Sequence, residues 1–479
     1  MTRYTTTTPQ DLAEMLAEIG VGSVDDLFAA VPQAMRFQGR LDLPAGLSEH
    51  EVFDHLRDLA ARNVSTEDEL CFLGAGMYDH YVPAVIDMLT ERSEFLTPYT
   101  PYQPEISQGG LQVMFEFQTA ISELTGLPVS NASVYDGPSA VGAAAYMAKL
   151  ANGRKRLVAS RALHPHSREV LHTMSHGYGT EVCETPLRDG ATDPRAWEEL
   201  LDQDVSAVFL SQPNFLGTVE DLEPLVAAAH RHGAIVVCAC DPIPLGILRS
   251  PGELGVDVAV GEGQTLGNRL DFGGPSFGFF AATEAYLRRM PGRIAGQTVD
   301  VDGRRGFVLT LQTREQHIRR ERATSNICTA QALNALAAVV YLSWLGRRGL
   351  VELGELLLSR TAYARERLCA LDGVLPLHEQ PVVREFAVRL RPASRVLDDP
   401  QRATATVRRV IERCQEEGVN PGYALGRDYP EYADGLLIAV TERRSRTHID
   451  RLAEVLGRAV DSESAPALHR HDSAVGARA

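Results

Sequence analysis

The sequence predicts an α/β protein, with a large domain in three layers around a mostly parallel sheet and a smaller C-terminal α/β domain. Short apolar, β-branched runs at 156–160, 206–211 and 234–240 alternate with helical stretches such as 222–233. Strands that are apolar throughout are buried on both faces, which is typical of a parallel sheet between two layers of helices. A chain of 479 residues also exceeds what one hydrophobic core holds, which is roughly 250 to 300 residues.

The chain divides where the pattern changes. Residues 1–65 are polar, and Ser or Thr precedes and Gly or Pro follows each of two short helical stretches, so we expect an N-terminal helical extension. Residues 66–330 alternate strands with helices and form the large domain. A linking helix and the small C-terminal domain occupy 331–460, with a late strand near the end. Residues 461–479 lack apolar periodicity, and we expect a disordered tail.

Composition excludes several classes of protein. The formal net charge of −16 repels nucleic-acid phosphates and anionic membranes. No apolar run of about 18 residues predicts a membrane span, and the polar first residues do not resemble a signal peptide. The seven cysteines are scattered, and no pairs of Cys or His lie at metal-ligand spacing. We therefore expect a cytoplasmic protein with reduced thiols, no metal site, no nucleic-acid partner and no membrane partner.

Lysine is scarce in this chain. Of the 47 basic residues only Lys149 and Lys155 are lysines, and a genome that favours arginine codons explains most of this bias. The chemical consequence is that a Schiff base has only two candidate amines, because arginine stays protonated. Both lie at the end of a helical stretch and in its exit turn, where solvated surface charge is the simpler interpretation.

Asp241 and the loop after the next strand resemble parts of a cofactor site. Asp241 follows the apolar run 234–240, at the carboxyl end of a predicted parallel strand, where such sheets bind ligands. In pyridoxal phosphate (PLP) enzymes of the aspartate aminotransferase fold, an acid here keeps the pyridinium nitrogen protonated. A turn or helix cap before Pro242 explains Asp241 equally well. Counting 23 residues from Asp241, to the loop that carries the Schiff-base lysine in these enzymes, reaches Gln264, whose amide cannot form an imine.

Two further stretches fit such a pocket. Asp136, Gly137 and Ser139 open a helix of small residues, and free N–H groups at a helix N-terminus suit a phosphate. Close packing of the Ala-rich face explains the same residues without a ligand. His166 lies in "HPHSREVLHT", near where PLP folds place a ring-stacking histidine, although an ordinary surface histidine is the alternative.

A loop and an arginine-rich stretch suggest a protein interface. The loop 97–108 is rich in Tyr, Pro and Gln, which is common in rigid binding surfaces. The stretch 313–329 is rich in arginine, which suits an acidic partner or a carboxylate. A turn packed on its own domain and a solvated helix face with Glu–Arg pairs, such as Glu315 with Arg319, are the alternatives. The interface candidates are Tyr99, Tyr102, Gln103, Glu105, Gln108, Arg319, Arg320 and Arg322.

Taken together, these segments resemble the glycine cleavage system P-protein, specifically its α-type subunit. The motifs include "DPIPLG", "GEGQTLGNRLDFGGPSFGFF" and "LLIAVTE". The resemblance covers almost the whole chain to about residue 460, in the stretches 72–126, 131–149, 241–246, 261–280, 317–338 and 436–442.

The resemblance implies a PLP-dependent transferase fold type I, the aspartate aminotransferase-like fold. In that family some bacteria divide the protein into α and β subunits of the same fold, and the α subunit lacks the lysine that binds PLP in the β subunit. The β-type lysine lies nine residues before "GGP", and nine residues before Gly273 of this chain is again Gln264. The resemblance therefore implies no catalytic residue here and a relic pocket, comprising Asp136, Gly137, Ser139, His166, Asp241 and Gln264.

The implied function is that of a non-PLP-binding α subunit. With a PLP-bearing β subunit, in an α2β2 assembly, it decarboxylates glycine and passes the aminomethyl group to the lipoyl arm of the H-protein. Three alternatives remain: an independent PLP enzyme using Lys149 or Lys155, a homologue recruited to specialised metabolism with another partner, and a pure scaffold for the β subunit.

Overall fold

The structure is a computed structural model in which the chain forms two compact units, residues 1–64 and 65–479. The ranges 66–330 and 331–460, which we predicted as a large and a small domain, both fall within the second unit. The described residues are 6–37, 39, 41–274, 276–392 and 399–464.

The first unit consists of short helices held by local caps. Helix α1 (Pro9–Ile19) begins after Thr8 and helix α2 (Glu49–Ala60) after Ser48, each with a reciprocal capping box. Two 3₁₀ turns lie between them, Val24–Phe28 and Gln33–Met35. Among the described residues of α1 and α2 none is buried, so caps rather than a core of their own hold these helices.

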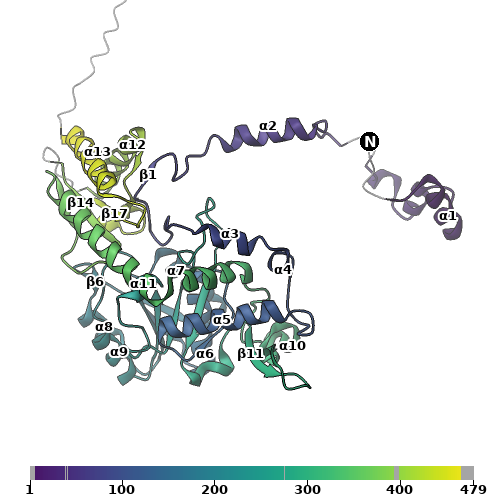
Figure 1. The fold of residues 1–479 in the computed structure, drawn as a ribbon, viewed down its shortest axis with the longest axis horizontal. Helices are drawn as coiled ribbons and strands as arrows, with labels where there is room; N and C mark the ends of the chain where they lie inside the picture. The colour runs from purple at the N-terminus through teal and green to yellow at the C-terminus, as the bar shows by residue number, and fades with distance from the viewer. Residues whose placement is uncertain (1–5, 38, 40, 275, 393–398, 465–479) are drawn as a thin grey trace, which may run out of the picture. The chain divides into compact units, whose positions relative to one another are not determined.

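The second unit is built on a seven-stranded sheet with the order β2-β10-β9-β8-β7-β3-β4 (Figure 1). Strand β10 runs antiparallel to both neighbours, and the four pairs from β9 to β4 are parallel. This confirms the predicted mostly parallel sheet. The strands are β2 (Val129–Ser130), β3 (Arg156–Ser160), β4 (Glu181–Thr185), β7 (Val205–Gln212), β8 (Ile235–Cys240), β9 (Val258–Glu262) and β10 (Gly278–Ala282).

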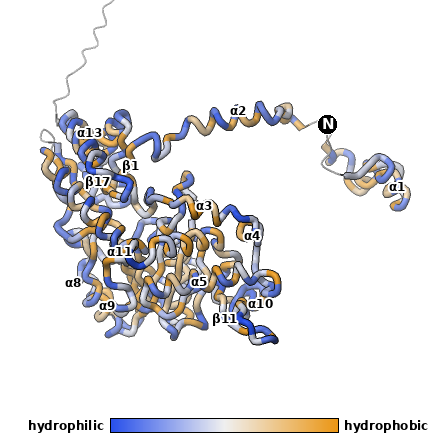
Figure 2. The backbone as a smooth tube through the Cα atoms, viewed as in Figure 1, coloured by the Kyte–Doolittle hydropathy of each residue, from blue (hydrophilic) through white to orange (hydrophobic). Residues whose placement is uncertain are grey.

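Helices cover both faces of this sheet. In β8, Val236 and Cys238 face one core, whereas Ile235 and Val237 face the other, as the alternation of side chains along a strand requires. Figure 2 shows hydrophobic segments at the centre of the unit and hydrophilic ones at its outer turns. The predicted three-layer architecture is therefore confirmed. The helices are α5 (Gln108–Thr125), α8 (Pro194–Leu200), α9 (Leu222–Arg231) and α11 (Ala332–Cys369) with one core, and α6 (Gly137–Asn152) and α7 (Pro165–Tyr178) with the other.

Helix α11 leads from the large domain into a smaller one. Its backbone leaves the helical conformation at Gly346, where φ is 60° and ψ is 179°. The small domain has an antiparallel sheet in the order β13-β14-β17-β16 and two helices packed on it. These elements are β13 (Val374–Pro376), β14 (Glu385–Leu390), α12 (Pro400–Glu416), β16 (Tyr423–Ala424), β17 (Gly435–Ala439) and α13 (Arg446–Ser464).

Short elements complete the second unit. β1 (Leu70–Cys71) pairs in parallel with β15 (Val419–Asn420), so the start of this unit is hydrogen-bonded to the small domain. The other short elements are α3 (Ala84–Thr90), α4 (Ser93–Leu96), the hairpin β5 (Leu187–Arg188) and β6 (Ala191–Thr192), the ribbon β11 (Ile294–Val299) and β12 (Arg305–Thr310), and α10 (Gln316–Arg319).

The C-terminal helix extends past the boundary that we expected at 461. Helix α13 ends at Ser464, and the buried carboxylate of Glu463 forms ion pairs with Arg409 and Arg413 of α12, each at 2.7 Å. These partners lie on another helix, so local periodicity could not indicate them. The rest of the predicted tail, 465–479, lies outside the described residues. Among the helices of the described part of the chain, none has the length and apolar character that a membrane crossing needs.

Candidate functional site

A pocket of about 770 Å³ lies at the carboxyl ends of β7, β8 and β9, the end at which parallel sheets bind ligands. We call it the main pocket. Four of the six predicted relic-pocket residues line it, namely Asp136, Gly137, His166 and Asp241. The other two, Ser139 and Gln264, are not among its described lining residues.

Asp241 is paired with an arginine of the small domain. Its carboxylate forms an ion pair with Arg384, whose side chain is almost fully buried. The other carboxylate oxygen accepts a hydrogen bond from the Ile243 N–H at 3.2 Å, so Asp241 also caps the turn that follows it. Arg384 stacks on Tyr78, with its guanidinium carbon 3.4 Å from the ring centroid. The negative charge of Asp241 is therefore compensated within the chain.

Gln264 is buried, with 1% of its surface exposed, and its amide bonds to the backbone. Its Oε1 accepts from the Tyr78 N–H at 3.0 Å, and its Nε2 donates to the Tyr78 carbonyl at 3.0 Å and to the Asn268 carbonyl at 2.8 Å. An amide can both accept and donate, so it satisfies both backbone groups of Tyr78 at once. Gln264 thus joins two segments 186 residues apart.

The N-terminus of α6 is occupied by carboxylates of the chain itself. Asp136 caps the helix by accepting from the Ser139 N–H at 2.7 Å. Glu262, the last residue of β9, accepts from the Gly137 N–H at 2.9 Å, from the Gln264 N–H at 3.2 Å and from the Ser276 hydroxyl. Burial raises the pKa of the Glu262 carboxyl, although these three hydrogen bonds oppose the rise.

His166 lines the main pocket beside a second, more buried histidine. His164 caps α7 by accepting from the His166 N–H through Nδ1 at 3.1 Å, and its Nε2 lies 2.9 Å from the Ala75 carbonyl. These contacts assign the proton to Nε2. Burial lowers the pKa of His164 to about 4. The pair therefore lies beside the main pocket as neutral His164 and exposed His166.

The residues of the main pocket do not fit PLP. There is no lysine among its described lining residues, and the amine of Lys149 instead donates to the Tyr178 carbonyl. The Gly137 N–H at the start of α6 is taken by Glu262, and Asp241 is paired with Arg384. An independent PLP enzyme would need the amine of Lys149 or Lys155 in this pocket, and neither lysine is among its described lining residues.

Sequence reasoning missed a cluster of polar residues where the main pocket meets the small domain, formed by residues 75–80, 384–385 and 442. The Tyr78 hydroxyl donates to Glu385 at 2.6 Å, and the same carboxylate accepts from the Ala75 N–H at 2.7 Å. Burial raises the pKa of Glu385. His80 accepts from Arg384 and lies 2.6 Å from the Glu442 carboxylate. The one available signal was the charged pair "RE" immediately before the apolar strand "FAVRL".

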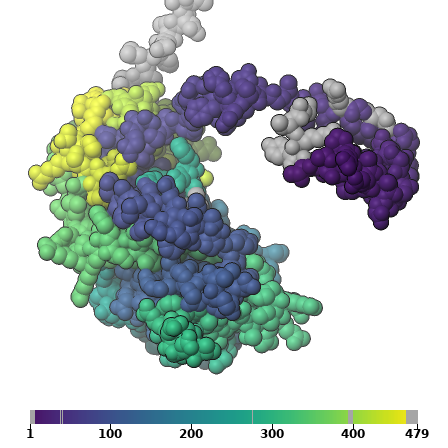
Figure 3. All heavy atoms as spheres, turned by 45° about the vertical axis from the view of Figure 1, so that its right-hand side comes forward, coloured from purple at the N-terminus to yellow at the C-terminus, as the bar shows by residue number. Residues whose placement is uncertain are grey.

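The two predicted interface segments contact each other. The Tyr102 hydroxyl accepts from Arg293 at 3.0 Å, and its ring lies 5.5 Å from that of His317 in the arginine-rich stretch. Figure 3 shows the blue region that contains α5 against the green region around residues 290–310. Gln108 binds the backbone N–H and carbonyl of Phe307, at 2.8 and 2.9 Å. All eight interface candidates are exposed, although Tyr102 and Gln108 also make these contacts: Tyr99, Tyr102, Gln103, Glu105, Gln108, Arg319, Arg320 and Arg322.

The ion pair that we considered between Glu315 and Arg319 does not form. Glu315 is buried and lies 3.6 Å from both Arg293 and His317. Arg319 instead donates to the Thr313 carbonyl at 3.1 Å. The first arginine of the stretch, Arg314, is buried and donates to backbone carbonyls, among them that of Gly292 at 3.0 Å, so it holds the fold together.

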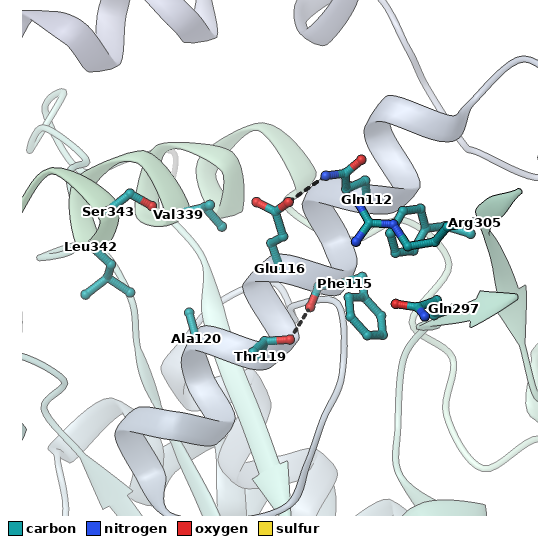
Figure 4. Close-up of a pocket in the computed structure, with 11 residues that line it drawn as sticks. Gln112, Phe115, Glu116, Thr119, Ala120, Gln297, Arg305, Val339, Leu342 and Ser343 are labelled. Carbon is teal, nitrogen blue, oxygen red and sulfur yellow. Dashed lines mark hydrogen bonds between the residues drawn. The ribbon is translucent and has the colours of Figure 1, made fainter. Parts of the chain in front are cut away.

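A second pocket of about 440 Å³ lies between α5, α11 and the β11–β12 ribbon (Figure 4). Its polar groups are bonded locally: Gln112 donates to Glu116 at 2.8 Å, and the Thr119 hydroxyl donates to the Phe115 carbonyl at 2.9 Å. Within the described ranges, His, Cys, Asp and Glu side chains nowhere gather in threes in a way that could hold a metal ion.

Comparison of the sequence with known proteins identifies the family of this chain. The family profile "Glycine cleavage system P-protein" matches residues 2–456. The probable glycine dehydrogenase (decarboxylating) subunit 1 of Carboxydothermus hydrogenoformans is 48% identical over 455 residues, which cover 95% of this chain and 99% of that protein.

Solved structures give the same result. An inhibitor-bound glycine decarboxylase (P-protein) of the glycine cleavage system is 41% identical, covers 96% of this chain and 100% of its own, and superposes with a TM-score of 0.84. A glutamate decarboxylase from Lactobacillus brevis is 13% identical over 92% of this chain and 98% of its own, with a TM-score of 0.67, and shows the fold alone. The fold is PLP-dependent transferase fold type I, as the resemblance implied.

Proposed function

Since this chain belongs to the glycine cleavage system P-protein family, we propose that it is the α-type subunit of a glycine dehydrogenase (decarboxylating). Its likeness along almost its whole length to proteins named as subunit 1 of that enzyme carries the proposal. With a β-type partner it decarboxylates glycine, and the aminomethyl group passes to the lipoyl arm of the H-protein. The seven free thiols support a reducing, cytoplasmic location.

We further propose that PLP belongs to the partner subunit and not to this chain. The buried Gln264 amide bonded to Tyr78, and the Glu262 carboxylate at the N-terminus of α6, support this assignment. When bound in the partner, PLP supplies the electron sink for decarboxylation. This chain then completes an α2β2 assembly and shapes the partner's site from outside.

Co-purification with the β-type subunit tests this function. We expect one PLP for each αβ pair, and none on this chain expressed alone and supplied with PLP. Glycine–bicarbonate exchange by the β subunit should rise when this chain is added. Unchanged exchange on complex formation would favour the pure scaffold, and PLP retained by the isolated chain would refute the assignment of PLP to the partner.

The exposed tyrosine loop and the arginines next to it are our proposed contact with the partner. Tyr99 is 79% exposed, which a side chain packed on its own domain would not be. Tyr99→Ala should weaken the αβ complex at least about tenfold in analytical ultracentrifugation, because buried aromatic anchors dominate interface energies. The control Leu375→Ala removes a 48% exposed side chain from β13 and should leave assembly unchanged. Equal affinities for the two variants would contradict this placement.

A further inference from the structure

Three hydrogen-bond donors converge on a single carboxylate at the edge of the main pocket. They are the Gly137 N–H, the Gln264 N–H and the Ser276 hydroxyl, and all three donate to Glu262. We call these donors the anion cradle. They come from three segments, namely the start of α6, the loop after β9 and the turn before β10.

In the anion cradle the backbone of Gly137 lies close to Glu262. A Cβ atom added to Gly137 would lie 3.0 to 3.2 Å from the N, Cβ and Cα atoms of Glu262, closer than ordinary packing allows. Gly137, Glu262 and Ser276 all line the main pocket, so whatever occupies the cradle borders that cavity. A carboxylate held by donors from three segments is bound as an anionic ligand would be.

We propose that Glu262 is a built-in substitute for a phosphate, and that it excludes phosphorylated ligands from the main pocket independently of Gln264. The proposal rests on the proposed function only in that this chain carries no PLP. It therefore explains the exclusion of phosphate by the presence of Glu262, and not by the absence of a lysine at position 264.

Occupancy and charge both support this role. The Glu262 carboxylate uses all three donors, so a phosphate would find no free N–H group there. It also brings negative charge to the positive end of the α6 dipole, where Asp136 already stands. A phosphate would therefore meet two carboxylates at the one place where a helix normally attracts it.

Removing the carboxylate should expose the cradle. In Glu262→Ala the three donors lose their partner and face the vacated volume, which is the arrangement that backbone phosphate sites use. In the matched control Glu262→Gln the side chain keeps its length and one carbonyl oxygen, so the volume stays filled.

Phosphate binding by the full-length chain tests the proposal. Inorganic phosphate would be titrated in isothermal calorimetry at constant ionic strength. We expect the Kd of Glu262→Ala to be at least about tenfold lower than that of the wild type, and Glu262→Gln to behave as the wild type. No gain in Glu262→Ala would overturn the proposal, and so would a gain in Glu262→Gln as large as in Glu262→Ala.

A second measurement uses the cofactor and its unphosphorylated form. In Gln264→Lys, the new amine condenses with the aldehyde of either pyridoxal or pyridoxal 5′-phosphate and releases water. Equilibrium dialysis should show no preference for the phosphorylated form in Gln264→Lys, and at least about a tenfold preference in Gln264→Lys combined with Glu262→Ala. A strong preference in Gln264→Lys alone would refute the role of Glu262.

The wild-type chain and the Glu262 variants distinguish the two proposals. Pyridoxal 5′-phosphate bound tightly in the main pocket of the wild type would refute both the assignment of PLP to the partner and the exclusion by Glu262. If the wild type binds no pyridoxal 5′-phosphate and Glu262→Ala gains no affinity for inorganic phosphate, only the role of Glu262 is refuted. The comparison with inorganic phosphate needs no lysine at 264, so it remains decisive if Gln264→Lys fails to fold.

Discussion

Gln264 stands where the family resemblance predicts the reactive amine of a PLP enzyme, and its side chain holds the backbone of Tyr78. Gln264→Leu would leave the buried N–H and carbonyl of Tyr78 unpaired. Since each unsatisfied buried group costs about 1–3 kcal/mol, we expect the free energy of unfolding to fall by about 2–4 kcal/mol in urea denaturation. Gln103→Leu changes an exposed glutamine and should have no measurable effect. Equal stabilities of these two variants would show that the Gln264 bonds are dispensable.

His164 should make stability depend on pH. Its pKa is about 4 in the folded chain, well below the ordinary histidine value of about 6.5, so the unfolded chain takes up the proton first as pH falls. The stabilisation is complete above pH 6.5 and is lost as pH falls towards 4. Since one pKa unit is about 1.4 kcal/mol, the loss between pH 7.5 and 5 is about 2 kcal/mol.

The variant His164→Asn removes this titration and keeps an oxygen that can cap α7. Its free energy of unfolding should fall less than that of the wild type over the same pH interval. The control His176→Asn removes an exposed imidazole from the same helix and should keep the wild-type pH dependence. If the free energy of unfolding changes equally with pH in all three proteins, His164 does not contribute to the pH dependence of stability.

Counting along the sequence identified Gln264 and Asp241, because motif spacing is a local property. The partners of these residues were out of reach: Tyr78 lies 186 residues before Gln264, and Arg384 lies in another domain. Glu262 was missed for a different reason. It reads as the end of an apolar strand, and only the folded chain brings Gly137 and Ser276 to it.

At the scale of elements, the strands and helices around the sheet follow from local pattern, but α11 does not. The sequence predicted a linking helix at the start of 331–460, and the structure places it from Ala332 to a break at Gly346. A second helical segment then continues to Cys369. Glycine reads as a stop signal, and the helix after it packs on small-domain residues that periodicity alone does not reveal.

The break at Gly346 is itself testable. A φ of 60° with a ψ of 179° is a region that essentially only glycine adopts, so Gly346→Ala should cost about 1–3 kcal/mol in the free energy of unfolding. The added Cβ would meet no atom within 4 Å, so the cost is one of backbone strain alone. Gly177→Ala in α7 also meets no atom, but its helical backbone predicts a gain of about 0.5–1 kcal/mol. A gain at both positions would contradict the break.

For the whole molecule, the ion pair between partly buried Asp241 and buried Arg384 joins the large sheet to the small domain. Removing one partner of a fully buried ion pair costs about 3–5 kcal/mol, because the other charge is left uncompensated. Since 18% of the Asp241 side chain is exposed, Arg384→Met should lose less than that in chemical denaturation. Combining it with Asp241→Asn should recover part of the loss, since no buried charge then stands alone. Strictly additive losses would show that the pair is not coupled.

The division into layers followed from the sequence, whereas the contact between the domains did not. The hydrophobic pattern of a buried strand or an amphipathic helix predicts which of its faces is buried. The junction instead depends on polar residues such as Tyr78, His80, Arg384, Glu385 and Glu442, which are brought together from three distant stretches. A single ionisable residue next to an apolar strand does not indicate which distant residues it will contact.

The amide of Gln264 has an evolutionary consequence. A lineage that acquired lysine at this position would first lose the three hydrogen bonds that hold Tyr78 and Asn268. It would gain no cofactor in return while Glu262 still fills the cradle. A single substitution to lysine would therefore weaken the fold without providing a place for a phosphate.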